Sequence, residues 1–100
     1  MSDVVNPWHP TTDPTDLKHL GKLSEELGEL IQVVARCTIQ GIDEVHPVTG
    51  KSNKLWLEEE FADVYANMLL VARRFGLRVD FVHNRMDDKA AYLRSWHEMT

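Results

Sequence analysis

Two short segments of the sequence carry acidic residues at the same spacing. Residues 23–30 read L-S-E-E-L-G-E-L, and residues 57–64 read L-E-E-E-F-A-D-V. Because a helix advances about 100° per residue, the second glutamate of each pair and the carboxylate three positions later share one flank, beside an apolar stripe. The residues on these flanks are Glu26 and Glu29 in the first segment and Glu60 and Asp63 in the second. If the two stripes pack together, four carboxylates converge beside the core.

Carboxylates grouped in this way repel one another and need a cation. Two carboxylates about 5 Å apart repel by roughly 3 kcal/mol at an effective dielectric constant of about 20. Ligands that are all oxygen suit Mg²⁺, Mn²⁺ or Ca²⁺, whereas zinc sites normally include Cys or His. Mg²⁺ also keeps positions open for water and phosphate oxygens. The residue types therefore predict a Mg²⁺ site, with Mn²⁺ as the alternative ion, that accepts a phosphorylated substrate.

Other interpretations of the acidic segments remain open. A single E-x-x-E is most often the solvated face of a surface helix, and its repetition makes that interpretation weaker. The Glu-x-x-His pairs of di-iron carboxylate bundles and the EF-hand loop are both absent from the sequence. The alternative function is a non-enzymatic helical adaptor whose acidic face binds a basic protein partner.

The paired motifs resemble those of the MazG-like all-α nucleoside triphosphate pyrophosphohydrolases. The pattern is E-E-x-x-E on one helix and E-x-x-D on the next, formed here by Glu25, Glu26, Glu29, Glu60 and Asp63. The resemblance covers residues 17–96, and the connection between the motifs is longer here than in the commoner family pattern. It implies a Mg²⁺-dependent enzyme that cuts a ribo- or deoxyribonucleoside triphosphate between the α- and β-phosphates, giving the monophosphate and pyrophosphate. It also implies a helical homodimer or homotetramer whose metal ligands are Glu26, Glu29, Glu60 and Asp63.

Further residues are candidates for contact with such a substrate. Glu25 and Glu59 point further towards solvent, and one of them would accept the proton of the attacking water. A triphosphate also needs basic partners. The candidates are Lys54 before the second acidic segment, and Arg85 and Lys89, which lie four residues apart on one helical face; for each, a solvated surface cation is an equally good interpretation. Asn67, one turn after Asp63, is predicted to contact the substrate or to form an interhelical hydrogen bond.

Three helices must position these residues. Apolar residues at helical spacing predict a first helix over residues 16–40, capped by Thr15 or Asp16 and ended by Gly41. A second helix is predicted from about residue 54 to the stop signal Gly76, and a third after a cap at Asp80. Residues 41–53 lack periodicity and are predicted to form a loop.

Length and composition fit a small helical domain. The 100 residues suit one domain, with residues 1–14, which contain three prolines, as an extended arm and residues 15–100 as a single all-α catalytic domain. No segment alternates with period two. We therefore predict a bundle of three main helices per chain. Two of the helices carry carboxylates along one flank, so the apolar surface available for a core within one chain is small. We therefore expect oligomerisation to complete the core.

Charge and hydropathy exclude several other functions. Eleven Lys and Arg against sixteen Asp and Glu give a net charge of −5, which disfavours a nucleic-acid polymer as partner. No signal peptide and no apolar run of about 18 residues is present, so we expect a soluble cytoplasmic protein without a membrane partner. Trp56 and Trp96 lie next to apolar stripes and are predicted to pack in the core rather than to stack on a base.

Overall fold

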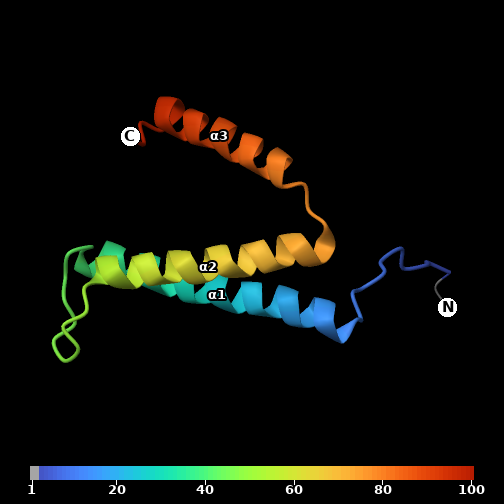
Figure 1. The fold of residues 1–100 in the computed structure, drawn as a ribbon, viewed down its shortest axis with the longest axis horizontal. Helices are drawn as coiled ribbons and strands as arrows, with labels where there is room; N and C mark the ends of the chain where they lie inside the picture. The colour runs from blue at the N-terminus through green and yellow to red at the C-terminus, as the bar shows by residue number, and fades with distance from the viewer. Residues whose placement is uncertain (1–2) are drawn as a thin grey trace.

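A computed structural model describes residues 3–100 as three α-helices, so the all-α prediction is confirmed. The helices are α1 (Pro14–Gln40), α2 (Asn53–Phe75) and α3 (Val79–Trp96). Figure 1 shows α1 and α2 side by side and antiparallel, whereas α3 turns back after α2 and lies apart from the other two helices. The first two residues of the predicted arm lie outside the described residues; the rest of the arm, residues 3–13, is exposed and non-helical.

The start of α1 differs from the prediction. The helix begins at Pro14, which was expected to end the arm, and Asp13 is the N-cap in place of Thr15 or Asp16. One carboxylate oxygen of Asp13 accepts hydrogen bonds from the backbone N–H groups of Thr15 and Asp16, at 2.9 and 3.0 Å. Proline is well suited to the first helical position, because an N–H there would have no partner within the helix.

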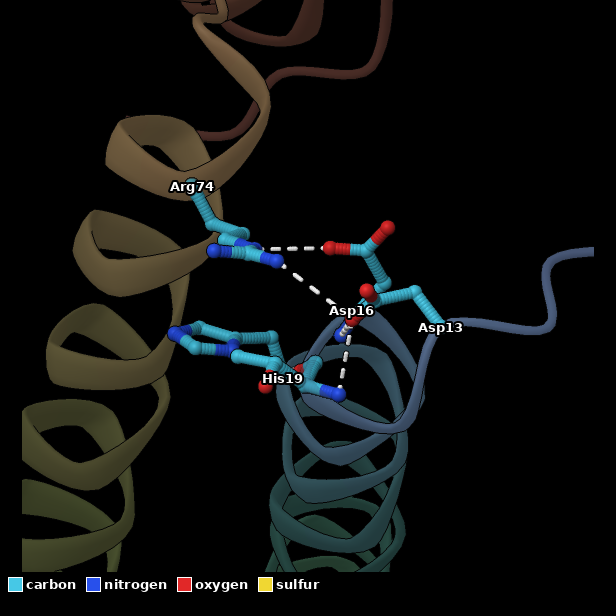
Figure 2. A network of polar contacts seen from close by, with 5 residues as sticks. Asp13, Asp16, His19 and Arg74 are labelled. Carbon is cyan, nitrogen blue, oxygen red and sulfur yellow. Dashed lines mark hydrogen bonds and ion pairs between the residues drawn. The ribbon is translucent and has the colours of Figure 1, made fainter.

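Arg74, near the end of α2, joins the two helices at this end of the hairpin. Its Nε donates to a carboxylate oxygen of Asp16 at 2.7 Å, and its Nη2 lies 3.4 Å from a carboxylate oxygen of Asp13 (Figure 2). His19 lies beside the pair, with its Nδ1 2.9 Å from the carbonyl oxygen of Thr15. The backbone N–H of Asp16, helped by that of Thr15 and by the Arg74 charge, lowers the pKa of Asp13.

The helix ends follow local signals at most positions. Gly41 ends α1 as predicted, and Gly76 ends α2 in the left-handed conformation with φ 62°. Ser52 caps α2, accepting a hydrogen bond from the N–H of Leu55 at 3.1 Å. The predicted cap of α3 is wrong, because that helix begins at Val79 and Asp80 lies in its first turn. A carboxylate there still favours the helix through its interaction with the helix dipole.

Two glycine substitutions should change stability in opposite directions. Gly76→Ala forces a side chain into the left-handed conformation and should destabilise the fold by about 1 to 2 kcal/mol. Gly21→Ala lies within α1, where an added Cβ meets no atom within 4 Å, and should stabilise it by about 0.5 to 1 kcal/mol. Urea unfolding monitored by circular dichroism measures both. Equal shifts of the same sign would contradict this account of the helix end.

The core is smaller than the sequence predicts. The fully buried apolar side chains among residues 3–100 are Val33, Val64 and Val71. Members of the predicted stripes such as Leu27 and Phe61 are 42% and 47% exposed, because two helices cover each other only along a narrow seam. The third helix buries no side chain, so it does not complete a bundle within one chain.

The two tryptophans predicted to pack in the core differ in their exposure to solvent. Trp96, predicted to be a core residue, is 76% exposed because α3 has no partner for its apolar face. Trp56 is half-buried, near the loop that joins α1 and α2. Across residues 3–100, none of the helices is long and apolar enough to cross a membrane.

Candidate metal site

Three of the predicted metal ligands meet across the seam between α1 and α2. Glu26 on α1 and Glu60 and Asp63 on α2 each offer a carboxylate oxygen, and these oxygens lie within 4.8 Å of one another. The antiparallel packing of the two helices brings the two acidic segments to the same level. Glu26 and Glu60 are half-buried and Asp63 is exposed. We call these three residues the acidic cluster.

Glu29 lies beside the acidic cluster rather than within it. It is half-buried one turn after Glu26 on α1, and it is not among the residues whose oxygens converge. Its charge nevertheless raises the pKa of both Glu26 and Glu60, so it lies close to both carboxylates. The fourth predicted ligand is therefore at the edge of the site.

The electrostatics of the acidic cluster are unfavourable without a cation or a proton. Burial is the largest cause that raises the pKa of Glu26 and Glu60, and repulsion from Glu29 and Asp63 raises both further. The Oε2 atoms of Glu26 and Glu60 are buried and have no hydrogen-bond partner within the described chain. Buried carboxylate oxygens without donors are costly, and a hard cation is a suitable partner for them. The residues present thus fit Mg²⁺ or Mn²⁺.

The two glutamates predicted to accept a proton are both paired with lysines. Glu25 lies 3.1 Å from Lys22 Nζ, and Glu59 lies 2.6 Å from Lys51 Nζ. Both carboxylates are on the exposed side of their helices, as predicted. The charge of Glu59 is one of the causes that raise the pKa of Glu60, so Glu59 lies close to the acidic cluster.

The predicted substrate-binding residues are not gathered in one place. Lys54 is exposed in the first turn of α2. The side-chain amide of Asn67 donates to the carbonyl oxygen of Asp63 at 2.8 Å, so this bond is within α2 rather than between helices. Arg85 and Lys89 line one hollow on α3 and do not meet the acidic cluster within a single chain. Their predicted roles therefore depend on a neighbouring molecule.

Sequence reasoning missed a second feature of the hairpin. A pocket of about 550 Å³ lies where the loop after α1 meets the start of α2, and we call it the loop-end pocket. Its wall includes Arg36, Gln40, His46 and Trp56. The available signal was spacing, because Arg36 follows Glu29 by seven residues, two helical turns on the same flank of α1.

The chain has no significant match among protein-family models, curated proteins or solved structures.

Proposed function

We propose that this protein is a Mg²⁺-dependent nucleoside triphosphate pyrophosphohydrolase of the MazG-like type. The observation that supports this function is the acidic cluster, in which carboxylate oxygens from two helices converge within 4.8 Å and two buried oxygens lack donors. The spacing of these carboxylates also resembles the metal-binding motifs of that family. The proposed reaction converts a ribo- or deoxyribonucleoside triphosphate into the monophosphate and pyrophosphate.

The proposed mechanism assigns separate roles to the carboxylates. Glu26, Glu60 and Asp63 would hold the metal, with Glu29 adding negative charge beside them. When bound, Mg²⁺ would lower the pKa of a coordinated water and neutralise charge on the phosphates. Glu59 is the better candidate to accept the proton from that water, because it is next to Glu60 in the sequence and its charge raises the pKa of Glu60. Proton acceptance would require Glu59 to part from Lys51.

Pyrophosphate release tests this function directly. The protein is incubated with each common and modified nucleoside triphosphate and Mg²⁺, and the products are separated by ion-exchange chromatography. We expect monophosphate and pyrophosphate with at least one substrate, and no product in EDTA. Orthophosphate with a diphosphate product would contradict the proposed cleavage. Absence of any hydrolysis would favour an adaptor, whose affinity for a basic partner should fall steeply with salt.

The proposed active form is a homo-oligomer. Within residues 3–100 three apolar side chains are fully buried, and α3 leaves Phe81 and Met86 at least half exposed. An apolar groove of about 480 Å³ lies between α2 and α3, lined by Met68, Leu77 and Val82 among others. A second copy of this chain presents apolar helix faces of the same kind, so it is the partner we propose for this groove.

Light scattering should give a molar mass of at least twice 11.5 kDa at micromolar concentration. Val82→Glu places a charge in the groove between α2 and α3 and should shift the mass towards that of a single chain. His9→Ala, in the exposed arm, is the control and should leave the mass unchanged. A monodisperse wild-type monomer would contradict the assembly.

A further inference from the structure

Trp56, in the wall of the loop-end pocket, contacts two cations, of which Arg36 also lines the pocket and Lys51 does not. The Arg36 guanidinium carbon lies 4.4 Å from the centroid of the Trp56 ring, and Lys51 Nζ lies 5.0 Å from it. Contacts of this kind attract a cation to the ring face and limit its motion. The half-buried Trp56 therefore holds Arg36 in the wall of the pocket and Lys51 beside the same ring.

Arg36 is available to bind an anion. Within residues 3–100 it forms no ion pair, whereas Lys51 is paired with Glu59. A guanidinium group has five N–H donors in a planar fork that matches the oxygens of a phosphate. A half-buried arginine without a carboxylate partner, held at the wall of a pocket, is thus an unused site for an oxyanion.

Two neutral side chains in the same wall also offer donors. His46 Nδ1 accepts hydrogen bonds from the backbone N–H groups of Val48 and Thr49, both at 3.1 Å, so the neutral ring carries its proton on Nε2. Gln40 Oε1 accepts a hydrogen bond from the Asn53 amide at 3.2 Å, which leaves the Gln40 amide nitrogen to donate. Apart from Glu44, the polar groups of the wall favour a negatively charged ligand.

The pocket continues the line of the acidic cluster. Trp56 precedes Glu60 by one helical turn on α2, a rise of about 6 Å. The positive charge of Lys51 partly offsets the rise in the pKa of the Glu60 carboxyl group, so this cation also lies near the cluster. A ligand that extends from the acidic cluster towards the loop would therefore run in the direction of Trp56 and the two cations beside its ring.

We propose that the loop-end pocket binds the terminal phosphates of the substrate and then the pyrophosphate leaving group, with Arg36 as the anion ligand in its wall and Lys51 as a second cation beside it. Trp56 is a positioning residue that orients both cations. Identification of the anion as part of a nucleotide rests on the proposed function, whereas the oxyanion site itself rests on the donors in the wall. The Trp56 ring already contacts two cations, so it is not assigned to stacking on a base.

Isothermal titration calorimetry with inorganic pyrophosphate and Mg²⁺ tests the site without requiring hydrolysis. Arg36→Gln should weaken pyrophosphate binding by about 10- to 100-fold, the usual range for loss of hydrogen bonds to a charged group. Arg36→Lys should retain part of the affinity. Lys18→Gln, which removes an exposed charge about 27 Å away along α1, is the control and should change affinity by less than about 2-fold.

Substitutions of Trp56 separate positioning from folding. Trp56→Phe keeps an aromatic face for Arg36 and Lys51 and should retain most of the pyrophosphate affinity. Trp56→Leu removes that face and should weaken binding by about 10-fold while thermal melts show that the protein is folded. Equal binding by the Leu and Phe variants would overturn the role given to Trp56.

Two outcomes distinguish this site from the proposed function. If no nucleotide is hydrolysed but pyrophosphate binding still depends on Arg36, the oxyanion site stands and the proposed enzyme activity fails. If nucleotides are hydrolysed and Arg36→Gln leaves pyrophosphate binding and the KM unchanged, the site is overturned. It is also overturned if Arg36→Gln weakens binding of nucleosides without phosphate, because the pocket would then hold the base.

Discussion

Glu60→Gln should reduce nucleotide hydrolysis by about 100-fold or more while making the metal-free protein more stable. The substitution removes a charged oxygen ligand from the acidic cluster at nearly constant shape, and weaker metal binding lowers the rate. The same change removes a half-buried negative charge whose pKa is raised by burial and by neighbouring carboxylates. In EDTA the variant should therefore melt at a higher temperature than wild type.

Adding Mg²⁺ should reverse this order of stability. A ligand that binds only the native state stabilises it by RT ln(1 + [L]/Kd), about 2.7 kcal/mol at 100 times Kd. Wild type should gain this stabilisation at millimolar Mg²⁺, and the Gln variant should gain much less because one ligand is weaker. Differential scanning calorimetry of both proteins, in EDTA and then in Mg²⁺, measures the effect.

Glu58→Gln is the matched control for this experiment. Glu58 lies on the same helix two residues earlier, is exposed and is outside the acidic cluster. Its substitution should change stability by less than about 0.5 kcal/mol in either buffer. If the Glu60 variant behaves like the Glu58 variant in both buffers, Glu60 is not a metal ligand.

The stability of the metal-free protein should rise as the pH falls from neutrality towards 4.5, the ordinary pKa of the two half-buried glutamates. The pKa values of Glu26 and Glu60 are raised in the folded state above the ordinary value of 4.5. The native state therefore binds more protons than the unfolded state in this window. Protonation relieves the repulsion, so this contribution to stability is fully present below the unfolded pKa and is lost as the pH rises through the raised folded-state pKa values.

Mg²⁺ should flatten or reverse this pH dependence. The metal binds the ionised carboxylates and competes with protons, so its stabilising effect should increase with pH. Asp13 has the opposite behaviour, but its pKa is lowered from 3.8 and its contribution is lost only below that value. Thermal melts across this pH range, with EDTA and with Mg²⁺, measure both trends. A melting temperature in EDTA that does not depend on pH would contradict the electrostatic account of the acidic cluster.

The helices and the facing carboxylates were predictable because their determinants are local. The helical spacing of apolar residues indicates α1 and α2, and the glycines at positions 41 and 76 specify where these helices end. The spacing of Glu26 and Glu60 places each on the flank of an apolar stripe, and the antiparallel packing of α1 and α2 aligns those flanks. Their convergence therefore needed only two elements and one antiparallel contact.

Some local features were mispredicted because several residues satisfy the same rule. Residue types that make good N-caps occur at Asp13, Thr15 and Asp16. Sequence preference alone does not decide which of these side chains accepts hydrogen bonds from the free backbone N–H groups. In the structure the N-cap is Asp13, and its carboxylate also contacts Arg74 near the end of α2. That contact joins residues 61 positions apart, so no local signal predicts it.

The sequence alone determined the helical periods, the acidic flanks and the turns, because each depends on residues within a few positions of one another. The tertiary structure decided which valines are buried, that α3 leaves the hairpin, and that Trp56 gathers Arg36 and Lys51 instead of packing in a core. These outcomes depend on contacts between residues distant in the chain. An amphipathic pattern shows that a helix face needs a partner, but only packing shows which surface covers it.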